Sequence, residues 1–135
     1  MKNPKANALR WFRQAEYDLD QGLDRLERSV FSYAAFFAEQ SAQKSLKAFL
    51  IFKGKRVVAI HSVGELAKQA AAMDAAFIPI LDEAKRLDRH YLASRYPDAL
   101  PDPAIPAESY VRAEAEEAIR TAQAIFAICR SLIPE

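Results

Sequence analysis

The chain has 135 residues, a length that one domain with a buried core accounts for. Its hydrophobic fraction is 51% and its charged fraction is 27%, which excludes a disordered chain. The formal net charge is +1, so no overall positive field draws the protein towards nucleic acid or an anionic membrane. A single cysteine, Cys129, excludes an intrachain disulfide and is typical of a reducing compartment.

The first residues lack the apolar stretch of a signal peptide, and no segment approaches the run of about 20 apolar residues that spans a membrane. We therefore expect a cytoplasmic protein. Only three glycines occur, and Ala and Leu outnumber the β-branched residues, which favours helix over sheet. The predicted fold is all-α: a single domain over residues 1–135, built as an up-and-down bundle of four main helices and one shorter helix.

The first predicted helix follows Asn3 and Pro4 and continues to about Arg28, because apolar residues recur there at spacings of three and four. Ser29 is then expected to cap the next helix through its hydroxyl group. This second helix extends from about Val30 to Lys53 and is apolar on most sides, which is typical of the centre of a bundle. Gly54 is expected to end it.

Four polar residues interrupt this central helix at positions i, i+3, i+4 and i+7, namely Gln40, Gln43, Lys44 and Lys47. One interpretation is a solvent-exposed face of an amphipathic helix. The other is a phosphate-attracting wall, in which lysine supplies a point charge and glutamine hydrogen-bonds a base or ribose. The sequence alone is compatible with both interpretations.

A third helix is expected to start at a capping box formed by Ser62 and Glu65. A fourth is predicted to begin at Pro79 and to end near Ser94, because Pro97 disfavours helical backbone at the residue before it. A loop with four prolines follows over residues 97–108, and the last helix is predicted over about 108–133.

On the predicted fourth helix, Asp88, Tyr91 and Arg95 are spaced i, i+3 and i+7 and therefore share one side. They would form either a structural Asp–Arg pair with a packed tyrosine or a phosphate site with Arg95 at the mouth of a cleft.

His61 precedes the expected third helix, and Arg56 with His61 forms an Arg-x4-His pattern. The histidine would belong either to the local turn or, with Arg56, to a catalytic pair for RNA cleavage. The sequence contains no P-loop, no GxGxxG and no HExxH motif, and it lacks a cysteine pair for zinc. We therefore predict neither a cofactor nor a metal.

Together these segments resemble the HEPN family, the higher eukaryotes and prokaryotes nucleotide-binding domain. The resemblance rests on the central segment 33–55, the helix start at His61, and the segment Tyr91-Leu-Ala-Ser-Arg-Tyr-Pro-Asp98. Trp11 with Ala15 in the first helix matches the opening of the family. The resemblance covers about residues 9–130, and its Arg-Tyr-Pro ending places the chain nearest the branch associated with minimal nucleotidyltransferases.

The resemblance implies a helical bundle that forms homodimers with a cleft between the subunits. It also implies a nucleotidyltransferase partner in a two-component, toxin–antitoxin-like system. The expected nucleotide-binding residues are Gln40, Lys44, Lys47, Asp88, Tyr91, Arg95 and Tyr96, with phosphate held by the two lysines and Arg95 and a base stacked on Tyr91 or Tyr96.

Other HEPN branches are metal-independent ribonucleases with an Arg-x4–6-His motif, for which Arg56 and His61 are the candidates here. The chain departs from that motif, since no His-x-Tyr follows: Ser62 and Val63 come after His61. Three functions are therefore open: a nucleotide-binding partner of a nucleotidyltransferase, a metal-independent endoribonuclease acting on RNA, and a non-catalytic module that docks another helix.

Overall fold

A computed structural model describes residues 3–134, and it contains no strand within them. The α-helices are α1 (Pro4–Glu27), α2 (Phe31–Phe52), α3 (Val63–Met73), α4 (Leu81–Leu87), α5 (His90–Ala93), α6 (Pro106–Ser109) and α7 (Arg112–Leu132). Two short 3-10 helices, η1 (Ala75–Ile80) and η2 (Pro97–Ala99), lie between them. The predicted all-α bundle is confirmed.

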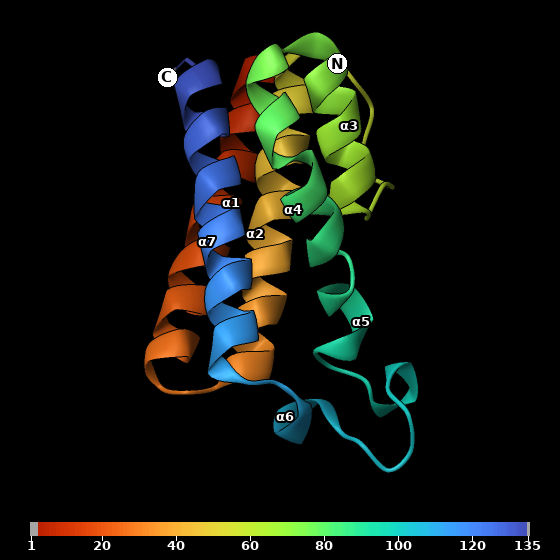
Figure 1. Cartoon of the computed structure of the whole chain (residues 1–135). Helices are drawn as coiled ribbons and strands as arrows, with labels where there is room; N and C mark the ends of the chain where they lie inside the picture. The colour runs from red at the N-terminus through yellow and green to blue at the C-terminus, as the bar shows by residue number, and fades with distance from the viewer. Residues whose placement is uncertain (1–2, 135) are drawn as a thin grey trace.

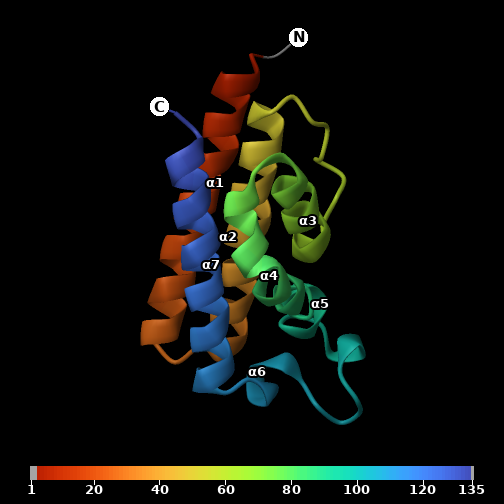
Figure 2. The same cartoon turned by 45° about the horizontal axis from the view of Figure 1, so that its top comes forward.

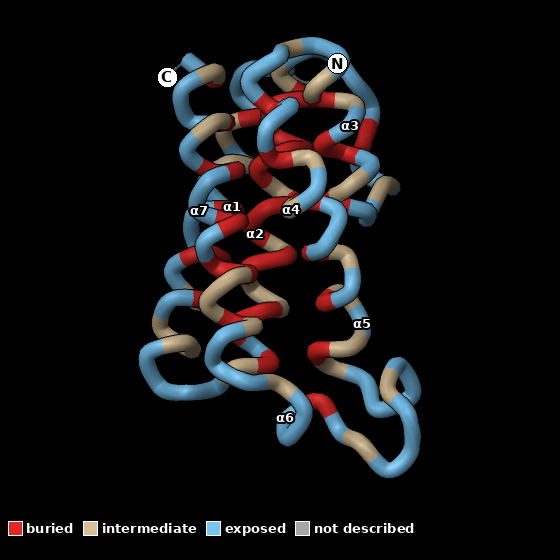
Figure 3. The backbone as a smooth tube through the Cα atoms, viewed as in Figure 1, coloured by how far each residue is buried: buried red, intermediate tan, exposed pale blue. Residues whose placement is uncertain are grey.

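Helix α2 lies at the centre of the molecule, between α1 and α7 on one side and α3 to α5 on the other (Figures 1 and 2). Fifteen of its residues are buried, from Ser32 to Ile51, so α2 is covered nearly along its whole length (Figure 3). Alanines such as Ala38 and Ala42 are fully buried, because small side chains let neighbouring helices approach closely. The predicted central position of this helix is confirmed. No helix within residues 3–134 combines the length and the apolar character that crossing a membrane requires.

The turn between α1 and α2 differs from the prediction. Ser29 does not cap α2, because Val30 is the N-cap residue and makes no side-chain hydrogen bond. Ser29 has a positive φ of 63°, whereas a capping residue has an extended backbone. Its hydroxyl instead accepts a hydrogen bond of 2.9 Å from the guanidinium of Arg112. Gly54, with φ of 85°, follows the end of α2 as predicted.

The predicted continuous helix from Pro79 to Ser94 is wrong. Pro79 lies inside η1, and the segment after it divides into α4 and α5. The break falls at Asp88, whose carboxylate accepts hydrogen bonds from the hydroxyl of Ser62 (2.7 Å) and from the backbone N–H groups of Val63 (2.6 Å) and Gly64 (3.1 Å). Asp88 thus stabilises the first turn of α3 from a distant part of the chain. Ser62 caps the Glu65 N–H as predicted.

The last helix begins four residues later than predicted. Residues Pro106–Ser109 form the separate short helix α6, and Tyr110 has an extended backbone before α7 starts at Arg112. The hydroxyl of Tyr110 lies 2.7 Å from Nδ1 of the buried His90. This contact ties the start of α7 to α5 and holds Tyr110 outside the helix.

Candidate functional site

The polar residues of α2 are largely covered rather than facing solvent. Gln43 is 4% exposed and Lys47 is 2% exposed, while Gln40 and Lys44 are half-buried. Glu39, one residue before Gln40, is completely buried. A solvent-exposed face therefore does not describe this stripe, since buried polar groups require partners within the protein.

A pocket of about 270 Å³ opens beside this stripe, and we call it the α2 pocket. Its walls come from α1, α2, the loop before α3, and α5 with the residues that follow it. It is lined by Trp11, Phe36, Gln40, Gln43, Lys44, Lys47, Val58, His61, Tyr91 and Arg95. The fold therefore joins five of the seven predicted nucleotide-binding residues with His61. Asp88 and Tyr96 are not part of the lining.

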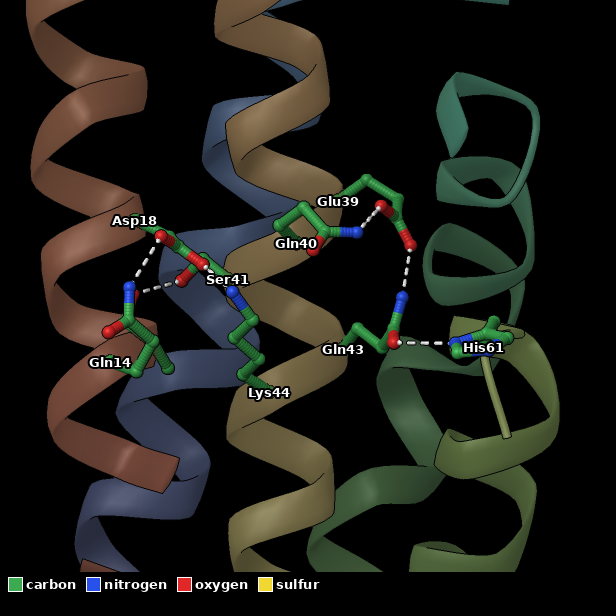
Figure 4. A network of polar contacts seen from close by, with 9 residues as sticks. Gln14, Asp18, Glu39, Gln40, Ser41, Gln43, Lys44 and His61 are labelled. Atoms are coloured by element: carbon green, nitrogen blue, oxygen red, sulfur yellow. Dashed lines mark hydrogen bonds and ion pairs between the residues drawn. The ribbon is translucent and has the colours of Figure 1, made fainter. Parts of the chain in front are cut away.

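A chain of hydrogen bonds connects the buried carboxyl of Glu39 to His61 in the pocket wall (Figure 4). Gln43 Nε2 donates to Glu39 Oε2 over 2.8 Å, and Gln43 Oε1 lies 3.3 Å from Nδ1 of His61. Because an amide oxygen only accepts, Nδ1 of His61 carries the hydrogen of this bond. The second ring nitrogen, Nε2, takes no part in this chain of contacts.

Burial raises the pKa of Glu39 from 4.5 to about 7, and the hydrogen bonds from Gln40 and Gln43 offset part of that rise. Gln40 Nε2 donates to the other carboxyl oxygen over 2.8 Å. A carboxyl group that titrates near neutrality thus supports the wall of the pocket. Glu39 was not among the residues predicted from the sequence. The signal for it was an acidic residue four positions before Gln43 on an otherwise apolar helix.

The two lysines of the stripe have different environments. Lys44 Nζ lies 2.6 Å from a carboxylate oxygen of Asp18, a buried residue of α1 that also accepts from Gln14 (Figure 4). Its charge is therefore compensated within the protein. Lys47 Nζ donates to the carbonyl oxygen of Val58 over 2.8 Å and forms no ion pair within residues 3–134. Burial lowers the pKa of Lys47.

Arg95 is held at the pocket by aromatic rings and by the backbone. Its Cζ atom lies 4.2 Å from the ring centre of Phe36, 4.9 Å from that of Tyr96 and 5.4 Å from that of Tyr91. Nε and Nη2 donate to the carbonyl oxygen of Tyr91 over 3.2 and 2.7 Å. The guanidinium has five N–H donors, so three remain for a ligand. Tyr96 contributes by packing on Arg95 rather than by lining the pocket.

His61 and Tyr91 form a second aromatic feature of the wall. Their ring centres are 5.7 Å apart and their planes are inclined by 11°, which is a stacked arrangement. Trp11 of α1 also lines the pocket, with its ring centre 5.4 Å from Lys47 Nζ. The pocket thus combines flat rings, amide groups and cations, the groups that bind bases, riboses and phosphates in proteins.

Arg56, the other predicted catalytic residue, is exposed in the loop between α2 and α3 and does not line the α2 pocket. Of the predicted catalytic pair, only His61 is therefore part of this pocket. Asp88 is occupied by the first turn of α3, as described above. Among residues 3–134 no group of three or more His, Cys, Asp or Glu side chains has the arrangement of a metal site.

Comparisons with known proteins agree with this architecture. The sequence model of the HEPN domain family matches residues 8–132 of this chain. TT1696 from Thermus thermophilus is 33% identical in a solved structure, with a TM-score of 0.81 over 92% of this chain and 96% of that one. ST0689, described as an archaeal HEPN homologue, is 32% identical, with a TM-score of 0.74 over 99% of this chain and 100% of that one. No curated protein matches the chain. With a family match over nearly its full length, the chain belongs to the HEPN domain family.

Proposed function

We propose that this HEPN domain binds a nucleotide in the α2 pocket. The observation that carries the proposal is the pocket itself, in which Arg95, Lys47, Gln40 and the stacked pair His61–Tyr91 share one cavity. Arg95 and Lys47 supply positive charge for phosphate, since neither is paired with a carboxylate among the described residues. Lys44 has a smaller role in phosphate binding, because Asp18 compensates its charge.

The base would lie against the flat side chains of the wall, where stacking does not require a particular base. Gln40 uses its amide nitrogen on Glu39, which leaves its oxygen to accept a hydrogen bond from a base or a ribose hydroxyl. His61 presents Nε2 as an acceptor because Gln43 occupies its Nδ1 position. In this proposal His61 is a binding residue and need not be catalytic. The ribonuclease hypothesis has no comparable support, because Arg56 lies outside the pocket.

The proposal extends to a homodimer that pairs with a minimal nucleotidyltransferase in a two-component system. The family resemblance of the Tyr91–Asp98 segment supports it. So do large hydrophobic side chains that stay exposed, among them Tyr17 (58%), Val58 (58%), Leu92 (49%) and Tyr96 (50%). Light scattering of the purified protein, alone and with such a partner, would give the mass of each assembly. A monomer that binds no nucleotidyltransferase would contradict this extension and leave nucleotide binding intact.

Isothermal titration with AMP, ATP and GTP tests the binding proposal directly. We expect Arg95→Gln to weaken nucleotide binding by about 10- to 100-fold, because hydrogen bonds to charged groups contribute about 1.5–3 kcal/mol. Arg120→Gln is the matched control, since Arg120 is an exposed arginine of α7 outside the pocket. Absence of binding to every nucleotide, or equal losses in both variants, would contradict the proposal.

A further inference from the structure

A second pocket, of about 430 Å³, lies at the N-terminal end of α2, and we call it the N-terminal pocket. It shares one residue, Arg95, with the α2 pocket. The prediction of nucleotide binding does not involve its other residues. Its lining consists of Ser29, Val30, Phe31, Ser32, Tyr33, Arg95, Pro97, Ile105, Pro106 and Ala107.

The helix end in this pocket has unsatisfied donors. The N-cap Val30 makes no side-chain hydrogen bond, and its carbonyl oxygen accepts the N–H of Ala34 as the first helical bond. The N–H groups of Phe31, Ser32 and Tyr33 make no hydrogen bond among the described residues. Helix α2 is 22 residues long, so its aligned peptide dipoles add a partial positive charge of about half an elementary charge at this end.

Ser32 provides a second and independent observation. This residue is only 6% exposed, it lines the pocket, and its hydroxyl makes no hydrogen bond within residues 3–134. The hydroxyl oxygen itself remains accessible to solvent, because Ser45 Oγ is the one side-chain atom among the described residues that is both buried and without a partner. Because Ser32 lines the pocket and uses its hydroxyl on no protein group, that hydroxyl is available to a ligand there.

The charges of the lining favour an anion. Arg95 contributes a guanidinium, and the lining contains no carboxylate side chain. Arg112 adds a second guanidinium close by, hydrogen-bonded to Ser29 and 4.9 Å from the ring centre of Phe31. The other walls are apolar, formed by Phe31, Ile105 and the prolines.

We propose that the N-terminal pocket binds the phosphate group of a small phosphomonoester. The phosphate oxygens accept hydrogen bonds from the free N–H groups at the start of α2, from Ser32 and from Arg95. Phe31, Ile105 and Pro97 pack against the organic part. The phosphate comes either from a separate ligand or from the nucleotide of the proposed function, since Arg95 belongs to both pockets.

Backbone NMR of the full chain tests this site with two probes, inorganic phosphate and AMP, each against sodium chloride at equal ionic strength. We expect phosphate alone to shift the amide resonances of Phe31, Ser32 and Tyr33. AMP shifts the same resonances if its own phosphate enters the pocket, and only those around His61 and Tyr91 if the pocket serves a separate ligand. Phosphate that shifts none of the three amides relative to chloride overturns the proposal, whatever the result for AMP.

Two variants at the pocket and one control variant sharpen the test. Val30→Asp places a carboxylate at the N-cap, where it accepts from the same N–H groups, so we expect a higher Tm and at least a tenfold loss of phosphate affinity. Ile78→Asp, at an exposed position of η1, adds the same charge away from the pocket and should leave phosphate affinity unchanged. Ser32→Ala removes the unpartnered hydroxyl and should weaken phosphate binding several-fold. Equal phosphate affinity in Val30→Asp and in the parent protein contradicts the proposal.

Discussion

The two sides of α2 are built by different means. On one side, which we call the regular side, α1 and α7 pack against α2 through apolar and small side chains. Helices α1, α2 and α7 are 24, 22 and 21 residues long. On the other side, which we call the irregular side, the longest helix is α3 with 11 residues. Apolar side chains such as Leu66 and Phe77 join the core there as well, and polar contacts such as those of Asp88 and His90 fix how the short segments connect. The α2 pocket lies where the two sides meet, because α2 supplies its floor while His61, Tyr91 and Arg95 come from the irregular side. Long helices thus give the site a fixed base, and single polar contacts position the groups that face it.

The largest expected effect comes from removing the contact that shapes the irregular side. Asp88→Ala leaves the N–H groups of Val63 and Gly64 without their acceptor, and we expect it to lower the free energy of unfolding by about 2–4 kcal/mol. Urea denaturation measures the loss. Asp20→Ala on the regular side is the control, since Asp20 is exposed on α1. Equal stability of the two variants would mean that Asp88 does not hold the irregular side together.

A pH titration compares the two sides through two buried groups, Glu39 on α2 and His90 on the irregular side. Between pH 4.5 and about 7 the folded protein keeps a proton on Glu39 that the unfolded chain has lost, so the Glu39 contribution to stability falls as pH rises. Burial lowers the pKa of His90 from 6.5 to about 4, so in that range the unfolded chain binds the extra proton. The His90 contribution therefore rises with pH between about 4 and 6.5. The two slopes oppose each other in the parent protein.

Glu39→Gln removes one slope and leaves the other. We expect its free energy of unfolding to rise between pH 4.5 and 6.5, by on the order of 3 kcal/mol, whereas that of the parent protein changes much less. His90→Gln should show the reverse, a fall in stability as pH rises from 4.5 towards 7. Urea titrations at several pH values across this range would measure both. Parallel curves for Glu39→Gln and the parent protein would contradict the assignment of the slope to Glu39.

The smallest expected effect distinguishes the two lysines of α2. Lys44→Met leaves the buried carboxylate of Asp18 without its cation, so we expect a stability loss of about 1–3 kcal/mol and little change in nucleotide affinity. Lys47→Met removes a buried amine whose pKa is already lowered, which we expect to cost less than about 1 kcal/mol while weakening nucleotide binding. Denaturation and calorimetric titration of both variants give the two measurements. A loss of nucleotide affinity in Lys44→Met together with a larger loss of stability in Lys47→Met would contradict the roles given to the two lysines.

The regular side could be predicted well from the sequence, because a helix that buries one face repeats its apolar residues at a fixed spacing. The start of α3 at Ser62 and the end of α2 at Gly54 followed from the local chemistry of helix ends. The break at Asp88 could not be predicted, because that residue binds the backbone about 25 positions earlier in the chain, and no local pattern reveals such a contact. Ser29 was misassigned as a cap because its positive φ depends on the turn and on Arg112.

For the candidate site, the sequence predicted most of the polar residues that line the α2 pocket. It did not predict the buried residues that hydrogen-bond or pair with them. Gln40, Lys47, Tyr91 and Arg95 line the pocket as a group, although Asp88 and Arg56 do not join them. Glu39 was overlooked because its burial depends on segments distant in the chain, which the spacing on α2 does not show. The ion pair between Lys44 and the buried carboxylate of α1 joins two helices and was equally hidden.

The uninterrupted helix α2 also sets the spacing between the two pockets. Ser32 of the N-terminal pocket and Gln40 of the α2 pocket are eight residues apart on the same helix, which corresponds to about 12 Å along its axis. Neighbouring helices cover α2 along nearly its whole length, so this distance is fixed by the backbone and not by side-chain rotation. A molecule that contacted both pockets would therefore be selected by its length as much as by its charge.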